Sequence, residues 1–233
     1  MLLSLPLMAI GQNKTVLTSS RVFPKPDKVA EFEKALANHA QKYHKGDVSW
    51  RVYFIETGPE TGGYMLSEGP STFEALDSRG DLSAEHTADW EKNVMPLTTG
   101  QGSTVYADYQ PDLSSAPLTS FSDKLVITHI IAKPGMIAGL ADIFKRLKKV
   151  WDANQDNVAV YAMVASGEPG FAQVNRLKDG LKELAANYRK PMSERYNAVN
   201  GANSFDAYLK DYANAVQSRW SEVLTYKPKL SSK

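Results

Sequence analysis

Two pairs of polar residues stand at matched positions in the sequence. Arg21 and His129 lie 108 residues apart, and so do Tyr53 and Tyr161. An arginine can bind a carboxylate or phenolate, a histidine can move a proton near neutral pH, and tyrosine hydroxyls can donate hydrogen bonds. Arg51, two residues before Tyr53, shares the face of Tyr53 if this segment is a strand. We therefore predict a ligand-binding site formed by these five residues.

The same five residues also have a plainer interpretation. Tyrosine and histidine on a half-buried strand are often satisfied core residues, and arginine often extends along the rim of a sheet. The chain contains no H-E-x-x-H motif, no glycine-rich phosphate loop and no G-x-S-x-G motif. No catalytic residue can therefore be assigned from the sequence, and whether the protein is an enzyme stays open.

The spacing of 108 residues belongs to a longer internal repeat. A predicted strand, a Lys-Pro turn and an amphipathic helix within Leu17 to Tyr43 recur within Leu125 to Trp151. Residues spaced 3, 4, 3 and 4 apart mark one face of each helix. They are Val29, Phe32, Leu36, His39 and Tyr43 in the first copy, and Ile137, Leu140, Phe144, Leu147 and Trp151 in the second.

Each copy continues with two predicted strands, a helix and a last strand. In the second copy we predict the closing helix over Phe205 to Trp220 and the last strand over Glu222 to Tyr226. A βαββαβ unit of the ferredoxin-like kind leaves one face of its sheet uncovered. We therefore predict an α+β fold in which two tandem ferredoxin-like repeats pack sheet to sheet as a barrel within one chain.

The repeats set the expected domain boundaries. The first ferredoxin-like repeat covers residues 13–113, a linker rich in Ser and Pro covers 114–124, and the second repeat covers 125–233 with an insertion over 177–203. The insertion brings Arg189, Arg195 and Tyr196, which could form a lid over the barrel. A solvated helix hairpin or an oligomer contact is the alternative.

Strand alternation predicts which side chains line the barrel. Trp50, Val52 and Phe54 share an apolar face that suits packing under helices, so Arg51 and Tyr53 point to the interior. The same reasoning places Tyr161 inside in the second copy, with Arg21 and His129 on the inner faces of the first strands.

Across roughly residues 16–230, the chain resembles the dimeric α+β barrel superfamily in a fused two-repeat form. The resemblance lies in the doubled Lys-Pro turn, the helix stripe, the Val-Tyr strand and the shared ending Y-x-P-x-L. The superfamily includes small quinone-forming monooxygenases and haem-dependent enzymes such as chlorite dismutases. No cofactor is predicted from the residues themselves, and haem is the alternative that the resemblance implies.

Composition excludes several classes of function. The formal net charge is +1, with 27 Lys and Arg against 26 Asp and Glu, so no strong field exists to attract nucleic acid. The absence of cysteine excludes disulfides and thiolate metal sites. The partner we expect is a small apolar or aromatic, possibly anionic, ligand, and a homo-oligomer is possible.

The first twelve residues, MLLSLPLMAIGQ, are apolar and uncharged, and resemble the hydrophobic part of a secretory signal. We expect a signal peptide over residues 1–12 and an exported protein, periplasmic or extracellular. The stretch is too short to span a membrane, which takes about 20 apolar residues. A buried N-terminal strand in a cytoplasmic protein is the alternative, because no Lys or Arg precedes the apolar run.

The three other histidines favour structural roles. His39 holds the place of Leu147 in the helix stripe, which indicates a buried, hydrogen-bonded residue. His44 follows the same helix, where the helix dipole favours a basic group. His86 and Asp89 have the spacing of two metal ligands, but no third ligand is near them in sequence, and no metal site is predicted.

Three functions remain open from the sequence. The first is a barrel that binds a small molecule between its two sheets. The second is an oxidoreductase, cofactor-free and monooxygenase-like or haem-dependent, that uses His129 and Arg21. The third is a structural or interaction protein whose barrel is filled by side chains. An interior cavity of a few hundred Å³ with converging polar groups would favour the first two.

Overall fold

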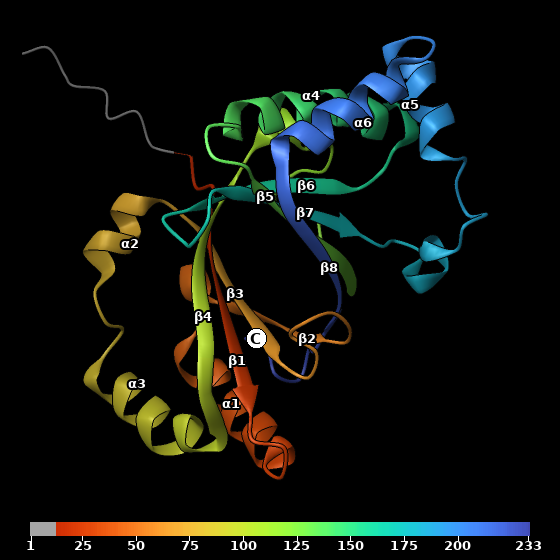
Figure 1. Ribbon diagram of the computed structural model, residues 1–233. Helices are drawn as coiled ribbons and strands as arrows, with labels where there is room; N and C mark the ends of the chain where they lie inside the picture. Colours follow the sequence, from red (N-terminus) through yellow and green to blue (C-terminus); the bar gives the residue numbers. More distant parts are fainter. Residues whose placement is uncertain (1–12) are drawn as a thin grey trace, which may run out of the picture.

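The computed structural model describes residues 13–233, in which eight strands form one closed barrel (Figure 1). Every neighbouring pair of strands for which a register is defined is antiparallel. Around the barrel the strand order is β1-β3-β2-β8-β5-β7-β6-β4. The predicted signal peptide, residues 1–12, lies outside the described residues.

The first repeat contributes four strands and three α-helices. Its elements are β1 (Val16–Pro24), α1 (Val29–Tyr43), β2 (Trp50–Ile55), β3 (Tyr64–Ser71), α2 (Phe73–Arg79), α3 (Ala84–Asp89) and β4 (Thr98–Tyr109). A π-helical turn over Trp90–Val94 extends α3, and a 3₁₀ turn over Met95–Leu97 leads into β4.

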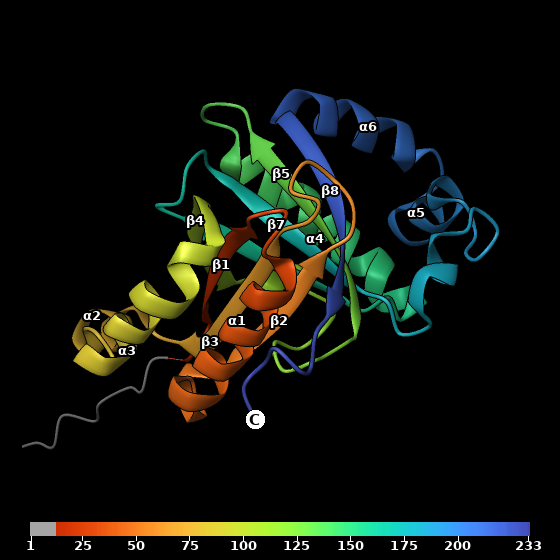
Figure 2. The same cartoon turned by 90° about the horizontal axis from the view of Figure 1, so that it is seen from below.

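The second repeat follows the same order with a longer first helix. Its elements are β5 (Lys124–Ala132), α4 (Ile137–Asn154), β6 (Val158–Val164), β7 (Gly170–Arg176), α5 (Met192–Asn200), α6 (Ser204–Ala215) and β8 (Val216–Tyr226). Both views show α1 to α3 on one side of the barrel and α4 to α6 on the other (Figures 1 and 2). No helix within residues 13–233 has the length and apolar character needed to cross a bilayer.

The strand registers confirm the internal repeat at single-residue precision. Arg21 lies opposite Met65 between β1 and β3, and His129 lies opposite Ala172 between β5 and β7. Tyr53 likewise lies opposite Met65, as Tyr161 lies opposite Ala172. Residues 108 apart in sequence therefore occupy equivalent places in the two halves of the barrel.

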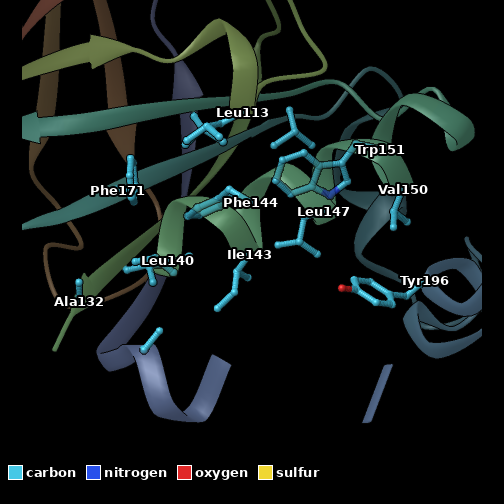
Figure 3. Packing of buried hydrophobic residues seen from close by; sticks show 14 residues of the cluster. Leu113, Ala132, Leu140, Ile143, Phe144, Leu147, Val150, Trp151, Phe171 and Tyr196 are labelled. Carbon is cyan, nitrogen blue, oxygen red and sulfur yellow. The ribbon is translucent and has the colours of Figure 1, made fainter. Parts of the chain in front are cut away.

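Three apolar clusters hold the layers together. The first lies between α4 and the outer faces of β5 to β7 and includes Leu140, Phe144 and Trp151 (Figure 3). The second packs α1 against β2 and β3 through Phe32, Leu36 and other residues. The third lies inside the barrel. Burial of apolar surface on both faces of the sheet stabilises the closed barrel, at roughly 25 cal/mol per Å².

The predicted end of the last helix is wrong. The structure ends α6 at Ala215 and begins β8 at Val216, so Trp220 lies on a strand and not in a helix. The apolar residues Phe205, Tyr208 and Tyr212 have helical spacing, and Val216 and Trp220 continue that spacing by chance. No glycine or proline marks the change from helix to strand.

Candidate interior site

All five residues predicted to form a ligand site line one cavity of about 490 Å³ inside the barrel. They are Arg21, Arg51, Tyr53, His129 and Tyr161. This placement matches the facing expected from strand alternation. The wall is largely apolar, with side chains such as Leu17, Met65 and Ile127. The interior is therefore not filled by side chains, which removes the main expectation of the structural-protein hypothesis.

A buried carboxylate, Glu222, joins Arg21 to His129. The two guanidinium nitrogens of Arg21 donate to the two oxygens of Glu222 at 3.0 and 2.6 Å. His129 Nε2 donates to Oε1 of the same carboxylate at 2.8 Å. Glu222 lies on β8, the neighbour of β5, and β8 is three strands from β1 in the ring of eight, so the contact with His129 joins adjacent strands and the contact with Arg21 crosses the barrel interior.

The environment keeps Glu222 ionised. Burial alone would raise the pKa of its carboxyl, but the hydrogen bonds from His129 and Arg21 outweigh burial and hold the pKa below its ordinary value. Arg21 Nη1 also lies 3.0 Å from Glu60 Oε2, so two carboxylates surround this guanidinium. Arg21 is thus neutralised within the protein, which argues against its predicted role as an anion receptor.

The ring of His129 is held in a fixed orientation. It stacks on the indole of Trp220, with ring centroids 4.6 Å apart and planes inclined by 11°. Since Nε2 donates to Glu222, the neutral ring presents Nδ1 as a proton acceptor. Within residues 13–233, Nδ1 makes no hydrogen bond. The arrangement of carboxylate, histidine and free ring nitrogen suits a general base.

A second cluster of polar side chains in the cavity consists of Tyr53, Tyr161 and two arginines. The Tyr161 hydroxyl lies 3.2 Å from Nη2 of Arg176, which donates to it. Burial raises the pKa of Tyr53 to about 12 and also raises the pKa of Tyr161, so both stay protonated at neutral pH. The positive charges of Arg51 and Arg176 act on both phenols in the opposite direction.

The two arginines of this group differ in exposure. Arg51 is exposed, and its guanidinium lies 5.6 Å from the ring centroid of Phe121. This exposed position of Arg51 agrees with the alternative interpretation, in which an arginine extends along the rim of the sheet. Arg176 is only 7% exposed, and its Nη1 is buried without a hydrogen-bond partner in the described part of the chain. A buried guanidinium with an unused N–H group costs free energy unless an acceptor reaches it.

Sequence reasoning missed Arg176, Trp220 and Glu222. Arg176 follows Ala172 and Val174 at every second position on the inner face of β7, at the last residue of the strand, where the alternation is hardest to follow from sequence. The sequence pattern places Trp220 at the end of a helix and Glu222 at the first residue of a strand, so neither is expected to face the interior. The shared Y-x-P-x-L ending contained a usable signal, because it aligns Trp220 and Glu222 with the inward-facing Ser103 and Val105.

Of the roles open to the insertion 177–203, a lid over the barrel interior does not agree with the structure. No described residue of this segment lines the interior cavity. Its helix α5 packs on α4 and α6, and Tyr196 is fully buried in their core (Figure 3). Arg189 and Arg195 both bind Asp156. The segment thickens the helical layer of the second repeat.

The side chains of the cavity do not fit haem as they are arranged. His129 is the only histidine that lines it among the described residues. Its Nε2 already donates a proton to Glu222. The ring also lies flat against Trp220, which leaves no room for a porphyrin on that side. An axial bond through Nε2 would require the Glu222 contact to break.

Solved structures resemble the whole chain in fold at low sequence identity. An anthrone oxidase-like protein matches with a TM-score of 0.57 and 12% identity, over 93% of this chain and 92% of its own. A provisionally assigned monooxygenase from Fusobacterium nucleatum matches with a TM-score of 0.55 and 14% identity, over 91% of each chain. A chlorite dismutase variant from Candidatus Nitrospira defluvii matches with a TM-score of 0.53 and 7% identity, over 93% and 92%.

The chain has the dimeric α+β barrel fold in a fused two-repeat form. No protein-family model matches the sequence. No curated protein matches it either. At identities of 14% and below, the similarity establishes the fold of this α+β barrel and not a shared activity.

Proposed function

We propose that this α+β barrel binds a small aromatic or apolar molecule that carries one acidic oxygen, such as a carboxylate or phenolate. The observation that carries the proposal is buried Arg176, which lines the interior cavity beside Tyr161 and whose enclosed Nη1 has no hydrogen-bond partner in the described residues, so that a small turn of the guanidinium would offer this N–H group to a ligand. The apolar wall would hold the ring system of the ligand. Arg176 would bind the anionic group, with Tyr161 as a second donor.

The pairing of charges favours Arg176 over Arg21 as the group that binds the anion. Both carboxylates near Arg21 already satisfy its charge, whereas no acidic side chain pairs with Arg176 in the described residues. A charge-assisted hydrogen bond contributes about 1.5–3 kcal/mol, more than a neutral one. The cavity volume of about 490 Å³ lies in the range of about 300–1,000 Å³ that is typical of ligand pockets.

A matched pair of ligands tests the proposal. We expect 2-naphthoate to bind with a 1:1 stoichiometry in isothermal titration calorimetry, and its neutral amide, 2-naphthamide, to bind at least about tenfold more weakly, since one charged hydrogen bond corresponds to about 1.5–3 kcal/mol. Arg176→Gln should remove the preference for the acid. Arg219→Gln, an exposed arginine on the outer face of β8, is the control and should leave it unchanged.

Two results would contradict the proposal. One is that neither naphthalene derivative binds to the folded wild-type protein. The other is that Arg176→Gln keeps the full preference for 2-naphthoate. If Arg176→Gln fails to fold by circular dichroism, Tyr161→Phe leaves the guanidinium in place and should reduce naphthoate affinity by a smaller factor.

A second candidate function is an oxidoreductase that begins by removing a proton from the bound ligand. The observation that favours it is the Glu222–His129 pair, whose free Nδ1 belongs to a ring at the cavity wall. The fold neighbours described as monooxygenase and anthrone oxidase-like add support by analogy only. In this alternative Arg21 fixes Glu222, and His129 accepts the proton.

Oxygen uptake with a phenolic substrate separates the two candidates. Consumption of O₂ by the wild type that is lost in His129→Gln, with ligand binding retained, would favour the oxidoreductase. Binding without O₂ consumption would favour the simpler receptor. The haem alternative has its own readout, because a Soret band after reconstitution that disappears in His129→Gln would place haem in the cavity.

A further inference from the structure

Three histidines distant in sequence come together outside the barrel, between α1 and α3. His39 lies in α1, His44 is the C-terminal cap of the same helix, and His86 lies in α3. One ring nitrogen from each lies within 4.8 Å of the others. The structure therefore supplies the nearby third histidine whose absence argued against a metal site in the sequence.

The other ring nitrogen of each histidine is held by an oxygen acceptor. His39 Nδ1 donates to Asp89 at 2.8 Å, His44 Nδ1 to the carbonyl oxygen of Val48 at 3.1 Å, and His86 Nδ1 to Asp81 at 3.1 Å. Such outer contacts fix the tautomer and orientation of the histidines in most metal sites. Here all three rings have that arrangement.

Three Nε2 atoms consequently face one another without protons of their own. His44 Nε2 and His86 Nε2 are 3.3 Å apart. His39 Nε2 is buried without a hydrogen-bond partner in residues 13–233, and His39 itself is 0% exposed. Lone pairs brought this close together repel one another unless a proton or a cation lies between them.

We infer that His39, His44 and His86 form a binding site for one divalent transition metal of the zinc class, with each ring bound through Nε2. The three-histidine ligand set and neutral imidazoles are those that Zn²⁺, Co²⁺ and similar ions prefer. In a tetrahedral site with Zn–N bonds of about 2.0–2.1 Å, two ligand nitrogens are about 3.3 Å apart. The His44–His86 separation has this value.

The widest separation within the cluster needs only a modest closure. All separations between the ligand nitrogens are within 4.8 Å, so metal binding would shorten the widest by at most about 1.5 Å to reach the tetrahedral spacing. Trp50 restrains one ring, because it stacks on His44 with ring centroids 3.5 Å apart. The side chain of His86 is 19% exposed and lies on the short helix α3, so the closure would come mainly from a shift of this helix turn.

The site would be open on one side. His44 and His86 line a cleft of about 690 Å³ under α2 and α3, together with Glu68, Arg79 and Trp90. Structural zinc sites take four protein ligands, whereas three protein ligands with one open position are typical of sites that bind water or an exogenous molecule. The fourth ligand would enter from this cleft. This cleft differs from the barrel interior, and the inference is independent of the proposed function.

Cobalt titration tests the site directly. We expect chelator-treated protein to bind one equivalent of Co²⁺ with the visible ligand-field bands of four-coordinate cobalt, and Zn²⁺ to displace it. His39→Leu and His86→Gln should each abolish these bands. Asp89→Asn should keep the site but weaken the affinity by about 10–100-fold, since it removes the contact that orients His39.

The control is His129→Gln, which removes the only other histidine and should bind cobalt as the wild type does. Absence of a one-equivalent cobalt spectrum in folded wild-type protein would overturn the inference. So would a spectrum that is unchanged in His39→Leu. His86→Gln guards against a folding defect, because His86 is only partly buried.

Discussion

The helical layers of the two repeats occupy equivalent places but differ in chemistry at one buried position of their first helices. In the second repeat, α4 covers the sheet with hydrocarbon, and Leu147 lies in its apolar cluster (Figure 3). In the first repeat the matching residue of α1 is His39, which is as deeply buried but faces two other histidines. The strand after each helix also differs at one matched position, where β2 has Trp50 and β6 has Val158.

This comparison separates what the fold requires from what it tolerates. Leu147 shows that a hydrocarbon side chain suits this position of the helix–sheet interface. The fold therefore does not require a histidine at position 39, and a buried ring nitrogen without a partner is a cost that a purely structural residue would not impose. A ligand for the histidines accounts for that cost.

The barrel interior differs between the repeats in the same way. Arg21 and His129 are equivalent, yet both depend on Glu222, whose counterpart in the first repeat is Val105. One carboxylate from the second repeat thus satisfies a basic group from each half. The two halves cannot be functionally interchangeable even though their backbones correspond.

The largest effect is expected at the shared carboxylate. Glu222→Leu should lower the free energy of unfolding by about 3–5 kcal/mol, because it leaves buried Arg21 with only the partly exposed Glu60. Urea denaturation at neutral pH measures this. The double variant Arg21→Met/Glu222→Leu should recover most of the loss. A single-variant loss below about 1 kcal/mol would show that the pair does not hold the barrel together.

The next effect is an asymmetry between the helical layers. Leu147→His should cost about 2–4 kcal/mol, since it buries a polar ring without partners. The reverse change, His39→Leu, should alter the stability of metal-free protein by less than about 1 kcal/mol. Thermal and urea unfolding of both variants gives the comparison. Equal losses would mean that His39 is a structural residue.

Acid should lower the free energy of unfolding more in the wild type than in a variant that lacks the Glu222 carboxylate. The folded pKa of Glu222 is depressed below its ordinary value of 4.5, so the unfolded state binds the proton more tightly. The stability from this group is complete above pH 4.5 and is lost as the pH falls through the folded pKa. Urea midpoints between pH 7 and more acidic values should fall less steeply in Glu222→Gln. Identical slopes would contradict the shifted pKa.

The smallest expected effect distinguishes the two matched tyrosines. Tyr161→Phe removes the acceptor for Arg176 and should cost about 1 kcal/mol. Tyr53→Phe should cost less, because the Tyr53 hydroxyl makes no hydrogen bond within the described residues. Unfolding curves of the two variants side by side provide the measurement, each serving as the control for the other. A larger loss for Tyr53→Phe would reverse the assignment.

Much of the fold could be predicted because the chain contains an internal repeat, so its two halves can be aligned with each other. The repeated helix stripe and the Val-Tyr strand fixed the order of elements, and period-two alternation placed Arg21, Tyr53 and Tyr161 in the interior. Both signals are local in sequence. The boundary at Ala215 escaped prediction because helical spacing continued by chance into β8.

The remaining site residues depend on tertiary structure. Arg176 lies next to Tyr161 only because β6 pairs with β7, and Glu222 reaches Arg21 across the barrel. The histidine cluster needs α3 to fold back on α1, which brings His86 to residues 42 and 47 positions earlier in the chain. No short-range pattern reports such contacts.

A crystal structure of the protein grown with 2-naphthoate tests the central claim, that the barrel interior is a receptor for an acidic aromatic molecule. We predict density for the naphthalene ring between the two sheets, with its carboxylate hydrogen-bonded to Nη1 of Arg176 and the Arg21–Glu222–His129 contacts intact. An unoccupied interior, or a ligand that binds only on the outer surface, would contradict the account.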